Sequence, residues 1–97
     1  MVTTESDVTD IGTKILNFNG VGFAYFAFSI GNLSQGTWKK IGTISQGNNF
    51  SFQAPMLSLN DGTHVGIIRL SSSNQAISVF PTKTGNQQIA ANAISLE

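Results

Sequence analysis

The stretch that decides the fold is VGFAYFAFSI, from Val21 to Ile30. Large side chains occupy every second position of this stretch, which is the pattern of a β-strand, and they change face once, between Tyr25 and Phe26. The first face carries Val21, Phe23 and Tyr25, and the second carries Phe26, Phe28 and Ile30. No part of the chain shows a convincing apolar repeat at helical spacing.

The change of face has two interpretations. A β-bulge between Tyr25 and Phe26 would bring all the large residues back to one buried face. Alternatively both faces are buried, one in the core and the other against another subunit. The strand alone does not distinguish these two arrangements.

Outward from this strand, turn signals recur at intervals of roughly eight to twelve residues, a spacing typical of short antiparallel strands in a sandwich or barrel. Asp61-Gly62 is the best hairpin signal, because this pair tolerates positive φ angles. We predict an all-β protein with an antiparallel β-sandwich or jelly-roll-like fold. The expected strands are Lys14–Phe18, Val21–Ile30, Thr37–Ile44, Phe50–Gln53, Pro55–Leu59, Val65–Leu70, Ala76–Phe80 and Gln88–Ser95.

A chain of 97 residues has room for one domain. Residues 1–13 are expected to form a flexible N-terminal arm, because Glu5, Asp7 and Asp10 have few apolar neighbours there. Residues 14–97 would form the sandwich. The acidic start is unlike a signal peptide, and the longest apolar run is too short to span a bilayer, so no membrane insertion is predicted.

The charge balance argues against nucleic acid as a partner. Five basic and five acidic residues give a formal net charge of +0, which leaves no electrostatic footprint for a phosphate backbone. The chain has no Cys, so disulfides, thiolate metal sites and a Cys nucleophile are excluded. A small core without disulfides makes oligomerisation a plausible source of stability.

The residues of the predicted sandwich offer no catalytic set. Apart from Glu97, Asp61 is its only acidic side chain, so no pair of carboxylates is available. Asp61 and His64 supply two metal ligands where a stable site needs three or four. We therefore predict no enzyme, no metal and no cofactor.

Recognition of a saccharide fits the remaining residues better. Trp38 is the only Trp and lies beside a turn, where its ring would serve as a stacking platform. Asn60, Asp61 and His64 cluster at another turn and would hold sugar hydroxyls, so these four are the candidate ligand-binding residues. The alternative is structural: Trp38 packs in the core or at its rim, Asp61 shapes the turn, and His64 begins the next strand.

From Val21 onward the order of motifs resembles the C-terminal head domains of tail-fibre and baseplate receptor-binding proteins of bacteriophages that infect Gram-positive hosts. The similarity covers residues 21–80. It consists of the aromatic strand, Lys40-Ile41-Gly42-Thr43-Ile44 with Gly47, Ala54-Pro55, Gly66-Ile67-Ile68-Arg69-Leu70, the polar turn Ser71 to Gln75, and Ala76-Ile77-Ser78-Val79. This chain departs from the family where the loop after Gly47 continues Asn48-Asn49-Phe50, and where Asn74-Gln75 closes the polar turn.

The resemblance implies a homotrimeric head at the tail tip or baseplate of a virion. Such a head contacts other tail or baseplate proteins and adheres to host cell-wall saccharide. Two other functions compete with this one. The first is a carbohydrate-binding accessory module of an enzyme or adhesin, and the second is a structural virion protein without a ligand.

Overall fold

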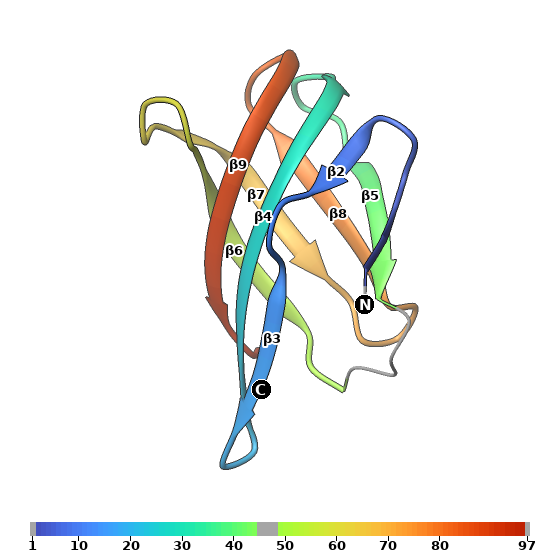
Figure 1. Cartoon of the computed structure of the whole chain (residues 1–97), viewed down its shortest axis with the longest axis vertical. Coiled ribbons are helices and arrows are strands. Elements are labelled where there is room, and N and C mark those ends of the chain that lie inside the picture. The colour runs from blue at the N-terminus through green and yellow to red at the C-terminus, as the bar shows by residue number, and fades with distance from the viewer. Residues whose placement is uncertain (1, 45–48, 97) are drawn as a thin grey trace.

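The computed structural model describes residues 2–44 and 49–96, and within them the chain forms nine strands and no helix (Figure 1). All strand pairs are antiparallel, so the predicted all-β antiparallel fold is confirmed. The strands are β1 (Val2–Thr4), β2 (Val8–Asp10), β3 (Lys14–Phe18), β4 (Val21–Leu33), β5 (Lys39–Ile44), β6 (Phe52–Ser58), β7 (His64–Leu70), β8 (Ala76–Pro81) and β9 (Gly85–Ile94).

The strands form one continuous sheet in the order β1-β5-β8-β7-β6-β9-β4-β2. β3 lies outside this order and pairs with the first residues of β4, from Val21 to Tyr25. The sheet curls on itself into a nearly closed, barrel-like shape, with β4 and β9 on the near side in Figure 1 and β7 and β8 behind them. Its two halves therefore face each other across a single core, much as the two layers of a sandwich do.

β4 has no bulge at its change of face. Its pairing with β9 runs without a break from Phe23↔Ile94 to Ile30↔Gln87, and the register shifts only between Ile30 and Leu33. The bulge interpretation of Tyr25 and Phe26 is therefore wrong. Instead the inner face changes from small to large side chains along the strand: Gly22 and Ala24 come first, followed by Phe26, Phe28 and Ile30.

The core is apolar and centred on β4. Phe26 and Phe28 are completely buried, and the ring of Phe26 meets that of Phe52 edge to face, with the ring centroids 6.1 Å apart. Edge-to-face contacts of this kind are favourable because the positive ring edge meets the negative ring face. Each strand from β4 to β9 contributes at least one buried apolar residue.

The expected flexible arm over residues 1–13 is wrong, because the structure places two strands there. β1 pairs with β5, and β2 pairs with residues Phe28 to Ile30 of β4. Val8 of β2 is buried against the core. The β-branched residues of Val2–Thr4 and Val8–Thr9 favour strands, and this signal outweighs the nearby acidic residues.

The link between β1 and β2 holds the two ends of the sheet together. The Glu5 N–H donates to the carbonyl oxygen of Ile41 in β5, and the carbonyl oxygen of Asp7 accepts from the Gly31 N–H in β4. The Asp7 carboxylate also accepts a hydrogen bond from Lys39 Nζ at 2.8 Å. Main-chain and side-chain groups of this link thus join β4 to β5 around the barrel.

Several strands differ in extent from the prediction. The two strands expected at Phe50–Gln53 and Pro55–Leu59 are one strand, β6, and the last strand begins three residues earlier, at Gly85. The turn signal at Gly47-Asn48 lies outside the described residues. β5 begins at Lys39, so Trp38 precedes the strand.

Gly66 allows β7 to bulge against β6. Met56 pairs with Gly66 and Leu57 pairs with His64, so Val65 is the extra residue of this bulge. Gly66 has a φ of 139°, and a Cβ atom here would clash with the carbonyl oxygen of Phe80 and lie 2.9 Å from the Cα of Pro81. Only glycine fits without strain.

We expect Gly66→Ala to lower the free energy of unfolding by about 2 kcal/mol or more, because strained backbone alone costs about 1–3 kcal/mol and the clash adds to it. Gly36→Ala is the matched control, since Gly36 also has a positive φ but a Cβ there would meet no atom within 4 Å. Urea denaturation measures both. Equal losses for the two variants would contradict the close approach at Gly66.

We expect the Asp7–Lys39 pair to make stability acid-sensitive. The hydrogen bond from Lys39 holds the pKa of Asp7 below its usual 3.8. A carboxyl with a depressed folded-state pKa contributes stability above its unfolded pKa, and that contribution is lost as pH falls through the folded value. Wild type should therefore melt above Asp7→Asn at neutral pH, and the gap should close below pH 3.8.

Thermal melts across this pH range measure the gap. Lys39→Gln provides the control, because it removes the positive partner of the same ion pair. In the double variant it should lower the melting temperature little beyond the effect of Asp7→Asn alone. If the difference in melting temperature between wild type and Asp7→Asn stays constant down to the lowest pH, the ion pair is not the cause of that difference.

Candidate functional site

Trp38 lies at the rim of the sheet, where the residue is 42% exposed. The ring packs on Phe80 of β8, with the ring centroids 5.2 Å apart, and the Arg69 guanidinium lies 4.4 Å from the Trp38 ring centroid. A guanidinium over an indole is attracted by the negative face of the ring. Trp38 is therefore held in place by two neighbours while much of its surface stays open to solvent.

Arg69 lies on the outer face of the sheet. It lies on β7 directly between Gln53 of β6 and Ser78 of β8, and its Nε–H donates to Gln53 Oε1 at 3.1 Å. The side chain of Arg69 thus contacts both Gln53 and the ring of Trp38. The bond uses Nε, and the terminal amino groups of the guanidinium carry further donors.

A concavity of about 320 Å³ opens beside the Trp38 ring. This volume is at the lower end of the range of roughly 300–1,000 Å³ found for ligand pockets. Its lining combines an indole, a guanidinium, hydroxyls and an amide, and comes from Trp38, Arg69, Ser71, Asn74, Ala76 and Ser78. Such groups can hold a polar, hydroxyl-rich molecule against an aromatic ring.

The polar turn at one end of the concavity is shaped by its own side chains. The Ala76 N–H donates to Asn74 Oδ1 at 3.1 Å, and the hydroxyls of Ser71 and Ser73 lie 2.9 Å apart. Gln75 has a φ of 60°, and its side-chain Nε2 donates to the Ser72 carbonyl oxygen. Local hydrogen bonds of this kind fix the turn where it borders the site.

The other three predicted ligand-binding residues lie at the β6–β7 turn and share no contact with Trp38 among the described interactions. The Asp61 carboxylate accepts from both the Oγ1–H and the N–H of Thr63, at 2.7 and 3.1 Å, and these bonds lower the pKa of Asp61. His64 begins β7 opposite Leu57. The Asn60 N–H donates to Ser58 Oγ.

These bonds give Asp61 the turn-shaping role that the structural alternative assigns to it. The concavity lined by Trp38 contains none of the three turn residues. The predicted set thus divides into one residue at a concavity and three at an exposed turn. Arg69, Asn74 and Ser78 were not among the predicted site residues, because only the pairing of β8 with both β5 and β7 brings this part of the chain beside Trp38.

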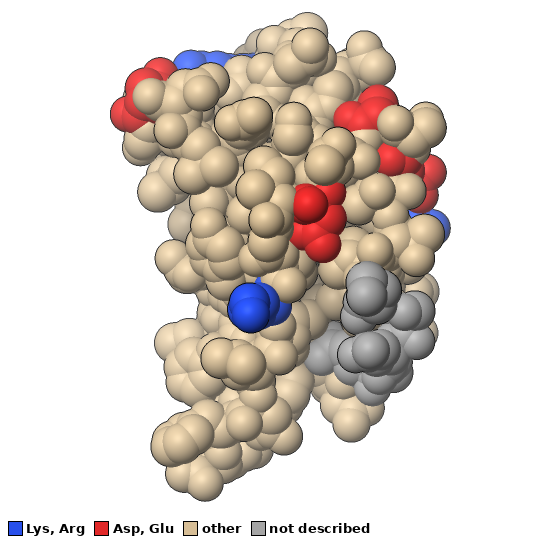
Figure 2. Space-filling model, viewed as in Figure 1, with Lys and Arg blue, Asp and Glu red and all other residues tan. Residues whose placement is uncertain are grey.

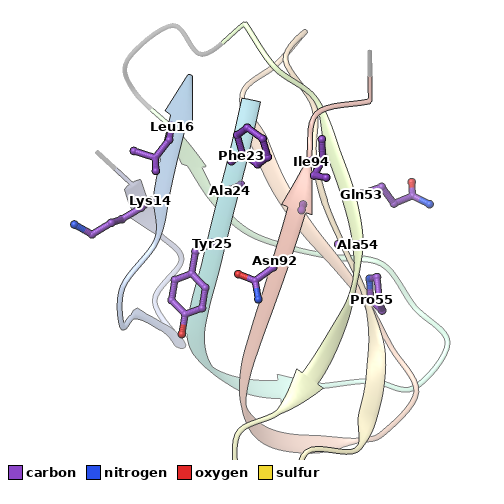
Figure 3. Close-up of a pocket in the computed structure, with 11 residues that line it drawn as sticks. Lys14, Leu16, Phe23, Ala24, Tyr25, Gln53, Ala54, Pro55, Asn92 and Ile94 are labelled. Carbon is purple, nitrogen blue, oxygen red and sulfur yellow. The ribbon is translucent and has the colours of Figure 1, made fainter. Parts of the chain in front are cut away.

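A second concavity, of about 740 Å³, lies on the other side of β6 (Figure 3). It runs between β9 and β6, with Phe23, Tyr25, Asn92 and Ile94 along one side and Gln53 and Pro55 along the other. Most of these side chains are apolar or aromatic. We refer to this concavity as the β6–β9 groove.

Pro55 explains why the sheet opens at the β6–β9 groove. The Leu59 N–H donates to the Gln88 carbonyl oxygen, and the Ser51 carbonyl oxygen accepts from the Leu96 N–H. These two hydrogen bonds lie at opposite ends of β6 and belong to the same antiparallel register with β9. Alternate residues of a strand direct their backbone groups to the same neighbour, which turns the nitrogen of Pro55 toward β9. Proline has no N–H to donate, and paired residues between β6 and β9 occur only at Leu57↔Ala90 and Ser58↔Ile89 in the described strands.

The described residues contain no helix that is long and apolar enough to cross a membrane. No group of three or more His, Asp or Glu side chains within them is arranged to hold a metal ion.

Comparisons with known proteins give no match for this chain. No protein-family model, curated protein or solved structure matches it. Function is therefore inferred from the residues and their geometry.

Proposed function

We propose that this protein is a saccharide-adhesion domain of the bacteriophage receptor-binding type, which acts by binding and not by catalysis. Its ligand is host cell-wall saccharide, held in the concavity beside Trp38. The observation that carries the proposal is a half-exposed indole, held by Phe80 and Arg69, next to hydroxyl and amide groups.

The chemistry of this concavity suits a sugar. A sugar ring has an apolar C–H surface that packs against an aromatic side chain, and it has hydroxyls that both donate and accept hydrogen bonds. Arg69 supplies donors, while Ser78 and Ser71 supply groups that donate and accept. Because none of the described residues that line the concavity is a carboxylate, they offer no candidate for general acid catalysis or nucleophilic attack by a carboxylate.

Adhesion at a virion tail also suits a weak site. Saccharide sites gain avidity when several are carried on one particle, because later binding events become intramolecular. A homotrimer at the tail tip, attached to other tail or baseplate proteins, would supply such repetition.

The test uses the single Trp of the chain as the reporter. Cell-wall saccharides of Gram-positive bacteria are titrated while Trp38 fluorescence is recorded. We expect the emission to change on binding and the apparent Kd to rise at least about tenfold in Arg69→Met, which keeps the aliphatic stem over the indole but removes the donors. Ser78→Ala should weaken binding in the same direction.

Asp61→Asn and His64→Ala are the matched controls, because both residues lie at the exposed β6–β7 turn. These variants should bind as wild type does. If they lose binding while Arg69→Met keeps it, the ligand site is the turn and not the concavity. A screen in which no saccharide binds at millimolar concentration would overturn the adhesion proposal and favour a structural virion protein without a ligand.

A further inference from the structure

The outer surface of β3, β4 and β9 carries a continuous set of exposed apolar side chains, which we call the apolar face. Leu16, Phe23 and Ile94 lie directly across from one another on the three strands, and residues paired in this way point to the same side of a sheet. The complete set is Leu16, Phe18, Val21, Phe23, Tyr25 and Ile94, with 39–68% of each residue exposed.

The apolar face is at the upper end of the size range for a surface left in water. At roughly 200 Å² for a whole aromatic side chain and somewhat less for an aliphatic one, the exposed fractions sum to an apolar area on the order of 600 Å². Monomers rarely exceed about 300–600 Å² in one patch, and each partner in a stable complex contributes about 800 Å². These six side chains alone supply most of that contribution.

The apolar face and the β6–β9 groove form one continuous surface. Leu16, Phe18 and Ile94 are the most exposed members of the apolar face. Leu16, Phe23, Tyr25 and Ile94 also line the groove, on the same side of the sheet (Figure 3). An apolar contact with a second copy can therefore extend from β3 across β4 and β9 to β6.

The charges of this surface also permit contact between identical copies. Among the residues that the structure describes, Lys14, opposite Tyr25, is the only charged one that lines the groove, and in Figure 3 its side chain points away from the labelled groove residues. Figure 2 shows the acidic groups of the near side gathered in its upper part, away from the lower end of β3 and β4. Two copies can therefore meet here without opposing like charges across the centre of the contact.

The edge of β3 lies at the margin of the same surface. β3 pairs with β4 and with no other described strand. An exposed apolar edge strand is an aggregation hazard unless something covers it. Lys14 is the only charged residue on this edge, which spans Lys14–Phe18.

We propose that identical copies of this chain assemble through the apolar face and the β6–β9 groove. This inference goes beyond saccharide binding and stands if no saccharide binds, because it depends on β3, β4, β9 and one side of β6. The concavity beside Trp38 is lined from β7, β8 and the residues next to them, and stays open in such an assembly. The two surfaces adjoin at Gln53, which lines the groove and accepts the hydrogen bond from Arg69.

The test is the molar mass in solution, measured by sedimentation equilibrium over a range of protein concentrations. We expect wild type at tens of micromolar to exceed the 10.3 kDa of one chain, and a three-copy assembly gives three times that mass. Leu16→Lys with Ile94→Lys should raise the dissociation constant more than tenfold, because it puts positive charge into the contact.

Leu16→Thr with Ile94→Thr is the milder variant, chosen because Thr is β-branched and keeps the strand propensity. It should weaken assembly in the same direction if the Lys variant fails to fold, which circular dichroism detects. Leu59→Thr is the matched control, because Leu59 is 49% exposed but lies beyond the end of β6, away from the apolar face. This control should assemble as wild type does.

Two outcomes overturn the proposal. A wild-type chain that remains a monomer at tens of micromolar shows that identical copies do not meet through the apolar face. Assembly that survives both double variants shows that copies meet through another surface. Saccharide binding is read separately by Trp38 fluorescence, so failure of assembly and failure of adhesion are distinguishable.

Discussion

The structure depends on the need to bury one face of a single long strand. Phe26, Phe28 and Ile30 of β4 are buried almost completely, and no other strand carries three such large residues in succession on its inner face. At about 25 cal/mol for each Å² of buried apolar surface, the two phenylalanines alone favour folding by several kcal/mol. The sheet curls around this row because a flat sheet would leave it in water.

The curl explains the role of the first thirteen residues. A curled sheet has two ends, and here β1 pairs at one end and β2 at the other. The link between them bonds to both β4 and β5, and Asp7 adds an ion pair with Lys39. A segment that is acidic and polar in composition thus closes the barrel, because main-chain pairing needs few apolar side chains.

The outer surface divides into two regions of different chemistry. β7 and β8 present Arg69, Ser78 and the polar turn beside Trp38, and this region suits a hydroxyl-rich ligand. β3, β4 and β9 present apolar side chains beside a groove that Pro55 opens. β6 separates the two regions, and the Gln53–Arg69 hydrogen bond lies on their boundary. The proposed saccharide site and the proposed contact between copies thus use separate sides of the molecule.

The sequence by itself determined the strand class and most strand positions, because alternation within Val21–Ile30 and the regular turn signals reflect local backbone geometry. It also identified Trp38 as a surface candidate and Asp61 as a turn former. Only the tertiary structure decided that the two faces of β4 serve different purposes, since burial depends on which strands pack against each face. Likewise Arg69 and Ser78 meet beside Trp38 only through the register of β7 and β8. Pairing between distant strands is a long-range property, and no local pattern in the chain encodes it.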